Sequence, residues 1–329
     1  MRILDEQALK SVLQMREVIA AVEAGFRAIA AGSTVSPERL RIEMPESEAI
    51  LLEMPSYMRA DKSGEAGLLG TKIVSVFGNN ERLGLETIQA IYVLLDAQNG
   101  GPAALMDGRL ITTMRTAATS ATATRHMAAK GRSILAIFGA GVQARAHAFA
   151  MVEVAEIERI LIVSRNQERA ARLSDDLALA LALQCSLSTP EEAVRSANLI
   201  CTCTTSPSPL FDGDWVKAGT HINAVGTFTP SATELDTATI VRARVAIDSW
   251  SAAGKEAGEI LIPLSEGAIS QDHIVGELSD IVCGKISGRA SEDQITVFKS
   301  SGLAIEDLVT AQLAYQKALQ LSAGVEVQL

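Results

Sequence analysis

The chain has 329 residues and a formal net charge of −10, with hydrophobic residues at 48% and charged residues at 21%. That length suits two domains, and that composition is ordinary for a soluble globular protein. The acidic balance disfavours nucleic acid as a partner, because proteins that bind it usually carry a basic face. No apolar run reaches the ~20 residues of a membrane span, and residues 1–6 lack the apolar core of a signal peptide, so we expect a cytoplasmic protein with no membrane partner.

The cysteines and histidines do not predict a metal site. Cys201 and Cys203 lie in an alternating, strand-like segment with no second Cys or His pair nearby, so we interpret them as free buried thiols. The four histidines are dispersed and show no H-E-x-x-H spacing. We therefore expect no metal.

In chain order, the first third predicts a helix followed by strands. Apolar residues recur at three- and four-residue spacing between Val18 and Ile29, which predicts a helix over 5–31 that Gly32 ends. Segments 50–54, 71–77 and 88–96 are β-branched or alternating and predict strands. Residues 109–130 are rich in alanine and threonine and predict a second helix.

From Ser133 onward, short apolar runs alternate with helical stretches. The strands predicted there are 134–138, 160–163, 199–203, 221–225 and 241–248, and a last helix follows at 303–321. This alternation is typical of an α/β protein with a Rossmann-type doubly wound parallel sheet. We predict a Rossmann dinucleotide-binding domain over 120–303 and a second, α+β domain built from both chain ends, 1–119 and 304–329.

A nucleotide fingerprint follows the first of these strands, and its residues read Gly139-Ala-Gly141-Val142-Gln143-Ala144. The first glycine allows a tight turn, the second lets the backbone approach a pyrophosphate, and the small last residue lets the helix pack close to the strand. The phosphates would lie on the helix N-terminus, where free N–H groups and the helix dipole favour an anion. We predict a dinucleotide site that includes Gly139, Gly141, Val142 and Gln143.

The end of the second strand bears on the choice of cofactor. It reads Ser164-Arg165-Asn166, where an NAD site usually places an acidic residue for the ribose hydroxyls. An arginine suits a 2′-phosphate instead, so we predict NADP, with NADPH preferred and all three residues in contact with it. NAD stays possible if Arg165 is solvated and Glu168 contacts the ribose.

Several stretches, in order along nearly the whole chain, resemble the ornithine cyclodeaminase/μ-crystallin family. They are residues 37–39, 54–55, 71–77, 114–118, 139–144, 230–236, 256–258 and 298–307. The resemblance implies a homodimer in which the Rossmann domain is joined to a substrate-binding and dimerisation domain made from the chain ends. It also implies an enzyme that acts on amino acids or cyclic imines, as cyclodeaminases, ketimine reductases and some amino-acid dehydrogenases do.

The resemblance assigns roles to individual residues. Arg39, Lys72 and Arg115 match the positions that hold a substrate carboxylate, a task that suits a guanidinium fork and an ammonium point charge. Arg41 could replace Arg39, and Lys72 lies in an otherwise apolar strand, where an uncompensated ammonium would be costly. The remaining substrate contacts implied are Met54, Phe228 and Thr229. The remaining cofactor contacts implied are Thr87, Arg115, Thr116, Thr204, Gly226 and a loop over the nicotinamide with Lys299, Ser300 and Gly302.

Phe228 departs from the cyclodeaminase pattern, which has an aspartate at that position. Phenylalanine cannot transfer a proton, and general acid–base help is worth roughly 10²–10⁴-fold per step. We therefore predict the simpler reduction of a preformed cyclic ketimine carboxylate, Δ1-pyrroline-2-carboxylate or Δ1-piperideine-2-carboxylate, to L-proline or L-pipecolate. In this hypothesis Lys72 is catalytic, Phe228 is an apolar wall against the ring, and Thr227 or Thr229 places a hydroxyl near the imine nitrogen. The opposing interpretation is that Phe228 packs in the core.

Two other functions stay open. A cyclodeaminase, or an alanine- or opine-type dehydrogenase, could take its acid from Glu53 or Glu256. A crystallin-like protein would bind the nucleotide without turnover.

Overall fold

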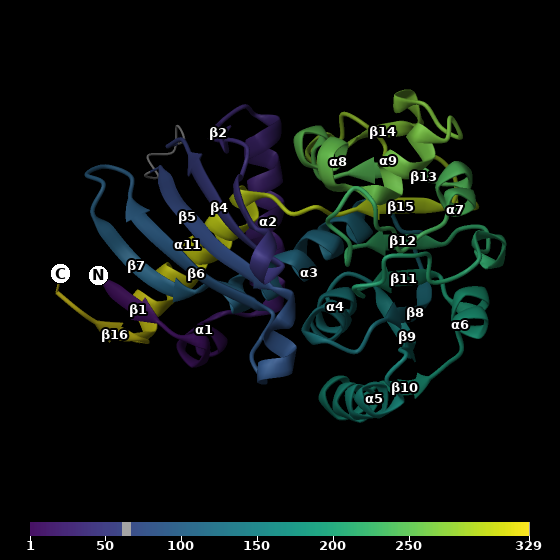
Figure 1. The fold of residues 1–329 in the computed structure, drawn as a ribbon, viewed down its shortest axis with the longest axis horizontal. Helices are drawn as coiled ribbons and strands as arrows, with labels where there is room; N and C mark the ends of the chain where they lie inside the picture. The colour runs from purple at the N-terminus through teal and green to yellow at the C-terminus, as the bar shows by residue number, and fades with distance from the viewer. Residues whose placement is uncertain (61–66, 329) are drawn as a thin grey trace. The chain divides into compact units, whose positions relative to one another are not determined.

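The computed structural model describes residues 1–60 and 67–328 and divides the chain into two compact units (Figure 1). The first unit contains residues 1–115 and 303–329, and the second contains residues 116–302. The first boundary falls inside helix α3 (Gly108–Met127). The sequence-based boundaries, after residues 119 and 303, lie close to these positions.

The first unit is built on an eight-stranded mixed sheet. Its strand order is β16-β1-β7-β6-β5-β4-β2, and β3 also pairs with β4. The strands are β1 (Arg2–Leu4), β2 (Thr34–Val35), β3 (Leu40–Met44), β4 (Ala49–Met58), β5 (Leu68–Phe77), β6 (Ile88–Asp96), β7 (Pro102–Asp107) and β16 (Val325–Glu326). The three strands predicted at 50–54, 71–77 and 88–96 are β4, β5 and β6.

The helices of this unit differ from the prediction in one place. Residues 5–31 form two helices, α1 (Glu6–Val12) and α2 (Met15–Ala30), instead of one. Asp5 caps α1, and the chain becomes extended at Leu13, which is buried and interrupts the helical run. Apolar periodicity does not reveal this break, because the buried residues on both sides of it continue the helical spacing.

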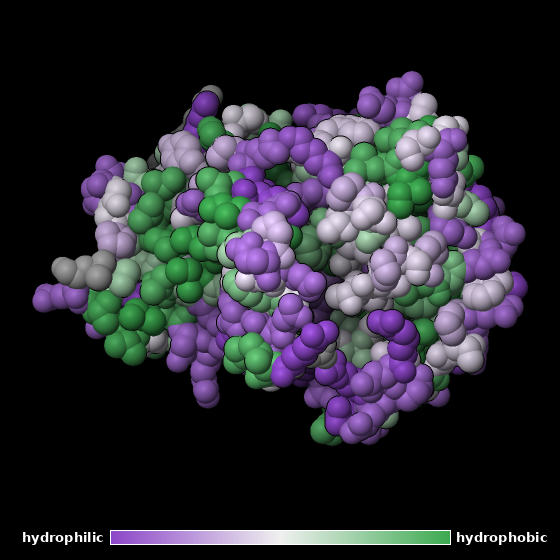
Figure 2. Space-filling model, viewed as in Figure 1, coloured by the Kyte–Doolittle hydropathy of each residue, from purple (hydrophilic) through white to green (hydrophobic). Residues whose placement is uncertain are grey.

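The two faces of the sheet have different environments. On one face Met54, Lys72, Tyr92 and Met106 are paired across β4 to β7 and are all buried. Helix α11 (Ala304–Leu321) packs against β4, β5 and β6, as Figure 1 shows. The opposite face of the sheet carries the adjacent row of paired residues, which includes Leu40 and Ile91 and is partly exposed. Figure 2 shows hydrophobic residues gathered over these strands.

The second unit is built on an eight-stranded sheet in which every pair of neighbours is parallel, with order β10-β9-β8-β11-β12-β15-β13-β14. This confirms the predicted doubly wound α/β fold. The strands are β8 (Arg132–Phe138), β9 (Glu156–Val163), β10 (Gln184–Leu187), β11 (Leu199–Thr202), β12 (His221–Ala224), β13 (Arg244–Ile247), β14 (Ile274–Glu277) and β15 (Thr296–Lys299). Its helices after α3 are α4 (Val142–Val152), α5 (Gln167–Leu181), α6 (Pro190–Ser196), α7 (Thr237–Arg242), α8 (Trp250–Glu256), α9 (Gly258–Ser265) and α10 (Leu278–Val282).

Two details of the predicted sheet are wrong. The segment that contains Lys299 is not wholly a loop, because Thr296–Lys299 forms the buried strand β15 between β12 and β13. The strand predicted at 241–248 begins only at Arg244, and the residues before it end α7. Thr296–Lys299 is only four residues long and has a polar residue at each end, so the sequence shows no alternating pattern there. Pairing with β12 and β13 is what makes this segment a strand.

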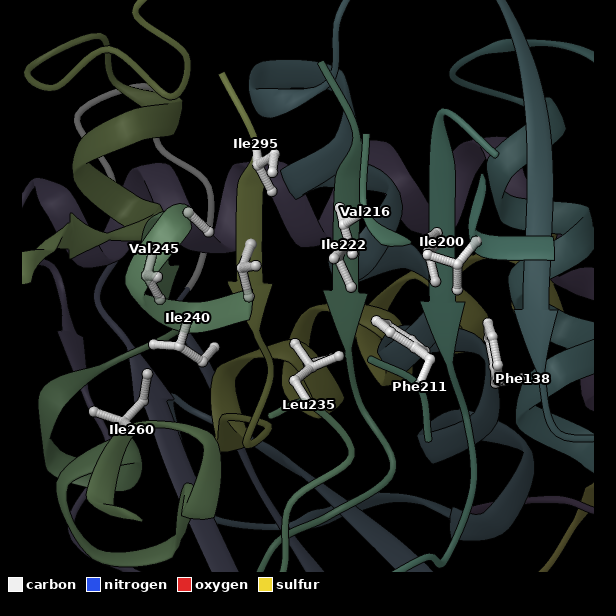
Figure 3. Close-up of a cluster of buried hydrophobic side chains, with 14 of the residues drawn as sticks. Phe138, Ile200, Phe211, Val216, Ile222, Leu235, Ile240, Val245, Ile260 and Ile295 are labelled. Atoms are coloured by element: carbon white, nitrogen blue, oxygen red, sulfur yellow. The ribbon is translucent and has the colours of Figure 1, made fainter. Parts of the chain in front are cut away.

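An apolar cluster fixes the positions of these strands. Phe138, Ile200, Ile222 and Val297 come from four strands and pack with residues of the connecting segments, as the close-up in Figure 3 shows for many of them. The rings of Phe138 and Phe211 lie 5.1 Å apart between centroids. The strand ends that follow this cluster are therefore held on a rigid base. Among residues 1–60 and 67–328, no helix is long and apolar enough to span a membrane.

Candidate active site

The carboxyl ends of the central strands of the second unit collect most of the predicted cofactor residues. Gly139 follows β8, Ser164 follows β9, and Ser300 follows β15, while Thr204 and Gly226 lie just beyond β11 and β12. The strand order reverses at β8, which has β9 on one side and β11 on the other. Ligands of open α/β sheets bind at such a reversal, outside the carboxyl ends of the strands.

The turn after β8 fits the pyrophosphate of a dinucleotide. Gly139 has a φ of +116°, and a Cβ there would lie 2.5 Å from the carbonyl oxygen of Cys203, so only glycine suits this position. Gly141 caps α4 without a side-chain hydrogen bond, and a Cβ on it would meet only open space. Val142 is 67% exposed. The first N–H groups of α4 are thus available to an anion.

Sequence reasoning did not assign a role to Glu234, although this buried carboxylate ties two strand ends together. It accepts hydrogen bonds from the Gly226 N–H at 2.7 Å, from the Thr204 N–H at 2.8 Å and from the Thr204 hydroxyl at 2.7 Å. Burial raises the pKa of the Glu234 carboxyl, while these hydrogen bonds act in the opposite direction. Glu234 therefore positions Thr204 and Gly226, two of the predicted cofactor residues.

Lys299 is anchored by buried contacts within the second unit. Its fully buried ammonium lies 2.9 Å from Glu259 Oε2 and donates to the Thr227 carbonyl at 2.7 Å and to the Thr227 hydroxyl at 3.1 Å. Two hydrogen bonds to Thr227 and an ion pair with Glu259 therefore hold the ammonium within the protein. The Thr227 hydroxyl in turn donates to Glu259 Oε1 at 2.6 Å. These contacts fix the loop after β12, and the contact of Lys299 with the cofactor stays a prediction.

Phe228 and Thr227 are neighbours that differ in exposure. Thr227 is 4% exposed, whereas Phe228 is 37% exposed. The interpretation that Phe228 packs in the core is therefore wrong. With the Thr227 hydroxyl bound to Glu259, Thr229 is the other candidate for a hydroxyl near a substrate, and it is partly buried.

A third carboxylate orders the turn that contains Gly302. Asp248 accepts hydrogen bonds from the backbone N–H groups of Ser301 and Gly302, the latter at 2.6 Å. The Ser300 N–H donates to the Ala224 carbonyl at 3.0 Å. Asp248 therefore holds in place the loop that the resemblance assigns to the cofactor, a role that no motif in the sequence indicated.

The end of β9 contains no acidic residue. Arg165 is exposed, and the Asn166 side chain accepts the Arg169 N–H at 2.9 Å and so caps α5. Glu168, the alternative ribose contact, lies in the first turn of α5 and makes an exposed ion pair of 2.8 Å with Arg172.

The first unit holds a separate, buried cluster of charges. The Lys72 ammonium lies 3.0 and 2.8 Å from Asp307 Oδ1 and Oδ2. Arg115 donates from Nε to Asp307 Oδ1 at 3.1 Å and pairs with Glu306 at 2.8 Å. Burial lowers the pKa of Lys72 to about 8, although the Asp307 charge acts to raise it. The sequence predicted both cations but assigned no role to either acid.

The sheet places two further residues beside Lys72. Met54, a predicted substrate contact, pairs with Lys72 across β4 and β5, and Tyr92 pairs with it across β5 and β6. Burial, together with the charge of Asp307, raises the pKa of Tyr92 well above its usual value. A Cβ at Gly70 would lie 2.5 Å from the Tyr92 hydroxyl, so glycine leaves the space that this ring fills.

The remaining predicted residues lie on other elements or at their ends. Arg39 is partly buried just ahead of β3, and Arg41 makes an exposed ion pair of 2.9 Å with Glu43. The Thr87 carbonyl accepts the Phe77 N–H at 2.9 Å, and Thr116 is buried at the start of the second unit. Glu53 pairs with Ile73 and so lies on the opposite face of the sheet from Lys72, which argues against Glu53 as the acid.

The part of the chain that the structure describes contains no group of three or more His, Cys, Asp or Glu residues arranged to hold a metal ion. The four cysteines form no disulfide, and Cys201 is buried.

Comparison with known proteins gives relatives along the entire chain. The model of the ornithine cyclodeaminase/mu-crystallin family matches residues 2–322. The chain is 33% identical over 330 residues to Δ1-pyrroline-2-carboxylate reductase of Bacillus thuringiensis, with 100% of both chains covered. Among solved structures, Δ1-pyrroline-2-carboxylate reductase of Thermococcus litoralis in complex with NADH and L-proline has a TM-score of 0.95 and 38% identity, covering 99% of this chain and 100% of that one. An archaeal alanine dehydrogenase dimer with bound NAD has a TM-score of 0.93 and 29% identity, covering 100% and 99%.

The family match extends from β1 to the end of α11, and both sheets have counterparts in the solved relatives. The chain therefore belongs to the ornithine cyclodeaminase/mu-crystallin family.

Proposed function

We propose that this protein is a nicotinamide-dependent ketimine reductase that converts Δ1-pyrroline-2-carboxylate, Δ1-piperideine-2-carboxylate or both to the cyclic amino acids. The observation that carries the proposal is the cluster around Lys72. It buries two cations, and two carboxylates that contact them, Glu306 and Asp307, are held in ion pairs. Such a cluster can bind an anionic substrate group but has no spare acid among those contacts.

The residues of the first unit would bind and orient the substrate. Arg115 can grip a carboxylate through its guanidinium fork, and Lys72 adds a point charge on the sheet face that also carries Met54. Arg39 supplies a third cation in this proposal. Binding of the carboxylate fixes the orientation of the ring and its C=N bond. This lowers the entropic cost of bringing the C=N bond and the hydride donor together.

A nicotinamide, when bound, supplies the hydride. C2 of the substrate gains a C–H bond, and the π electrons of the C=N bond pass to nitrogen. The substrate nitrogen is protonated before the reduction, from solvent or through Lys72, whose lowered pKa of about 8 allows it to exchange a proton near neutrality. The half-exposed Phe228 ring supplies an apolar surface rather than an acid.

The cofactor preferred in this proposal is NADPH. The support comes from Arg165 after β9 and from Glu168, whose carboxylate is paired with Arg172. The relatives with bound cofactor contain NADH or NAD, so a preference for NADPH would be a departure from them.

The assembly that we propose is a homodimer. Support comes from the apolar outer face of the first sheet, where Leu40, Ile42 and Ile91 are 50%, 49% and 44% exposed, and from the dimer described for the archaeal relative. Apolar residues gathered on one face mark a surface that a partner covers. Sedimentation velocity of the purified protein measures this directly.

The decisive experiment measures oxidation of NADPH and NADH with Δ1-pyrroline-2-carboxylate and Δ1-piperideine-2-carboxylate. Parallel assays use ornithine with NAD, scored by ammonia release, and pyruvate with ammonia. We expect rapid reduction of a cyclic imine and little activity in the parallel assays. Ammonia release from ornithine at a matching rate would identify a cyclodeaminase instead. Cofactor binding without turnover on any of these compounds would identify a crystallin-like protein.

A further inference from the structure

Asp307 is a single carboxylate that two buried cations share. We propose that Asp307 is the positioning residue of the carboxylate site, holding the Lys72 ammonium and the Arg115 guanidinium together in the arrangement that receives the substrate. This inference rests on the proposed function, because it concerns the same site.

The geometry requires such a residue. Lys72 extends from the middle of β5 and Arg115 from α3, and both cations converge on Asp307 Oδ1, at 3.0 and 3.1 Å. Two long cationic side chains that are buried together would repel each other, and their desolvation would be uncompensated without a counterion. Asp307 is itself fully buried in the first turn of α11, so its position is set by packing.

Glu306 cannot replace Asp307 in this role. Its carboxylate pairs with Arg115 at 2.8 Å and also accepts the Leu303 N–H at 3.1 Å, at the start of α11. Its hydrogen bonds hold one cation and the helix end. Of these two acids, Asp307 is the one with hydrogen bonds from both Lys72 and Arg115 among the described residues.

The arrangement leaves capacity for a ligand. An ammonium has three N–H groups, and the two oxygens of Asp307 take at most two of them. One donor of Lys72 can therefore meet a substrate carboxylate while Asp307 keeps its hold. Each of the two cations thus has a counterion before the substrate arrives.

Asp307 also governs the charge of Lys72. The groups that face Lys72 are Asp307 and Glu306 from α11, Arg115 from α3 and Tyr92 from β6. Asp307 exerts the largest effect that raises the pKa of Lys72, against the lowering by burial and by Arg115. Removing the Asp307 charge would therefore let Lys72 lose its proton at a lower pH.

The test compares Asp307→Asn and Asp307→Glu with a matched control, Thr310→Val, which changes a buried residue one turn further along α11 outside the ion pairs. We expect Asp307→Asn to raise KM for Δ1-pyrroline-2-carboxylate about 10–100-fold with a much smaller change in kcat, as for lost ground-state binding. The alkaline limb of kcat/KM should move down by about 1–3 pH units. Asp307→Glu keeps the negative charge, so the alkaline limb of kcat/KM should stay at its wild-type pH while KM rises. Thr310→Val should change neither quantity.

Wild-type KM and an unshifted alkaline limb in Asp307→Asn would overturn the inference, as would a fall in kcat alone. If that variant does not fold, wild-type KM in Asp307→Glu overturns it. Calorimetric binding of pyrrole-2-carboxylate, a planar carboxylate that is not reduced, keeps the inference separate from the proposed function. One outcome would support the inference and refute the proposed function. In that outcome the wild-type protein binds pyrrole-2-carboxylate but reduces no imine, and Asp307→Asn no longer binds the compound.

Discussion

The two units use buried carboxylates in opposite ways. In the first unit, Asp307 and Glu306 balance cations that come from a strand and a helix and that can meet an anionic ligand. In the second unit, Glu234 and Asp248 bind backbone N–H groups of loops after the strands. In the proposed function, the first arrangement prepares side chains to bind the substrate, whereas the second shapes the backbone against which the dinucleotide would lie.

The difference follows from where each site lies on its sheet. Lys72 lies in the middle of a strand and projects from its face, so its charge must be neutralised inside the core. The predicted cofactor residues of the second sheet lie just beyond strand ends, where backbone N–H groups lack ladder partners and need acceptors. Changes in pH and single substitutions should therefore affect the two units differently.

The largest expected effect concerns acid, and it should be confined to the second unit, which contains all four histidines. Burial lowers the pKa of His147 to about 4 and of His221 to about 3. Below the unfolded pKa near 6.5 the unfolded chain binds protons that these folded residues do not, so stability falls as pH falls from about 6.5 toward 4. The loss by pH 5 is on the order of 2 kcal/mol for each histidine. Urea unfolding at pH 7.5 and 5 measures it.

His147→Gln provides the check on this assignment. In the neutral ring of His147, Nδ1 donates to the Gln143 carbonyl and Nε2 accepts from the Ser120 hydroxyl. The variant should be less stable at pH 7.5 but should lose less stability on acidification than the wild type. An unchanged pH dependence would mean that other groups cause the acid sensitivity.

The next effect tests the charge cluster of the first unit. Lys72→Met should lower kcat/KM for the imine by about 100-fold, because a charged hydrogen bond to the substrate carboxylate is lost and Asp307 keeps one cation instead of two. Binding of NADPH, followed by its fluorescence, should be unchanged. The exposed Lys10→Met, which loses a surface ion pair with Glu6, is the matched control. Near-wild-type kinetics in Lys72→Met would remove this residue from the site.

A smaller effect is expected at the strand ends of the second unit. Glu234→Gln keeps the shape but sets an amide N–H against the donors of Thr204 and Gly226, so one hydrogen bond is replaced by a clash of donors. We expect about a 10-fold rise in the KM for the dinucleotide, with a much smaller change in the KM for the imine. Glu191→Gln, on the exposed face of α6, is the control. The opposite pattern, with the imine KM affected most, would contradict the separation of roles between the two units.

The smallest effect concerns cofactor choice. Arg165→Ala should lower the ratio of kcat/KM for NADPH to that for NADH by about 10-fold, since an exposed charge paired with a phosphate is worth about 1–2 kcal/mol. The measurement is the pair of saturation curves with each cofactor. The proposed preference for NADPH would be refuted if the wild-type protein prefers NADH and if Arg165→Ala leaves the ratio of the two kcat/KM values unchanged.

Much of the architecture was predictable because its signals are local. Alternating strands and helices from Ser133 onward indicated a parallel sheet, and the fingerprint at Gly139 needed no distant contact to be identified. The break between α1 and α2 and the strand β15 were not predictable, because tertiary burial at Leu13 and at Thr296–Lys299 decides them. The cations Lys72 and Arg115 were identified from the resemblance, and their ion-pair partners were not.

The sequence by itself determined the fold class, the nucleotide fingerprint, the cationic residue types and the absence of an acid at Phe228. These depend on residue type and spacing along the chain. The tertiary structure alone decided that Asp307 joins Lys72 and Arg115, and that the Lys299 ammonium binds Thr227. It also decided that Phe228 turns outward. Which acceptor a buried donor finds depends on groups that folding brings together from distant segments, and no local pattern encodes that choice.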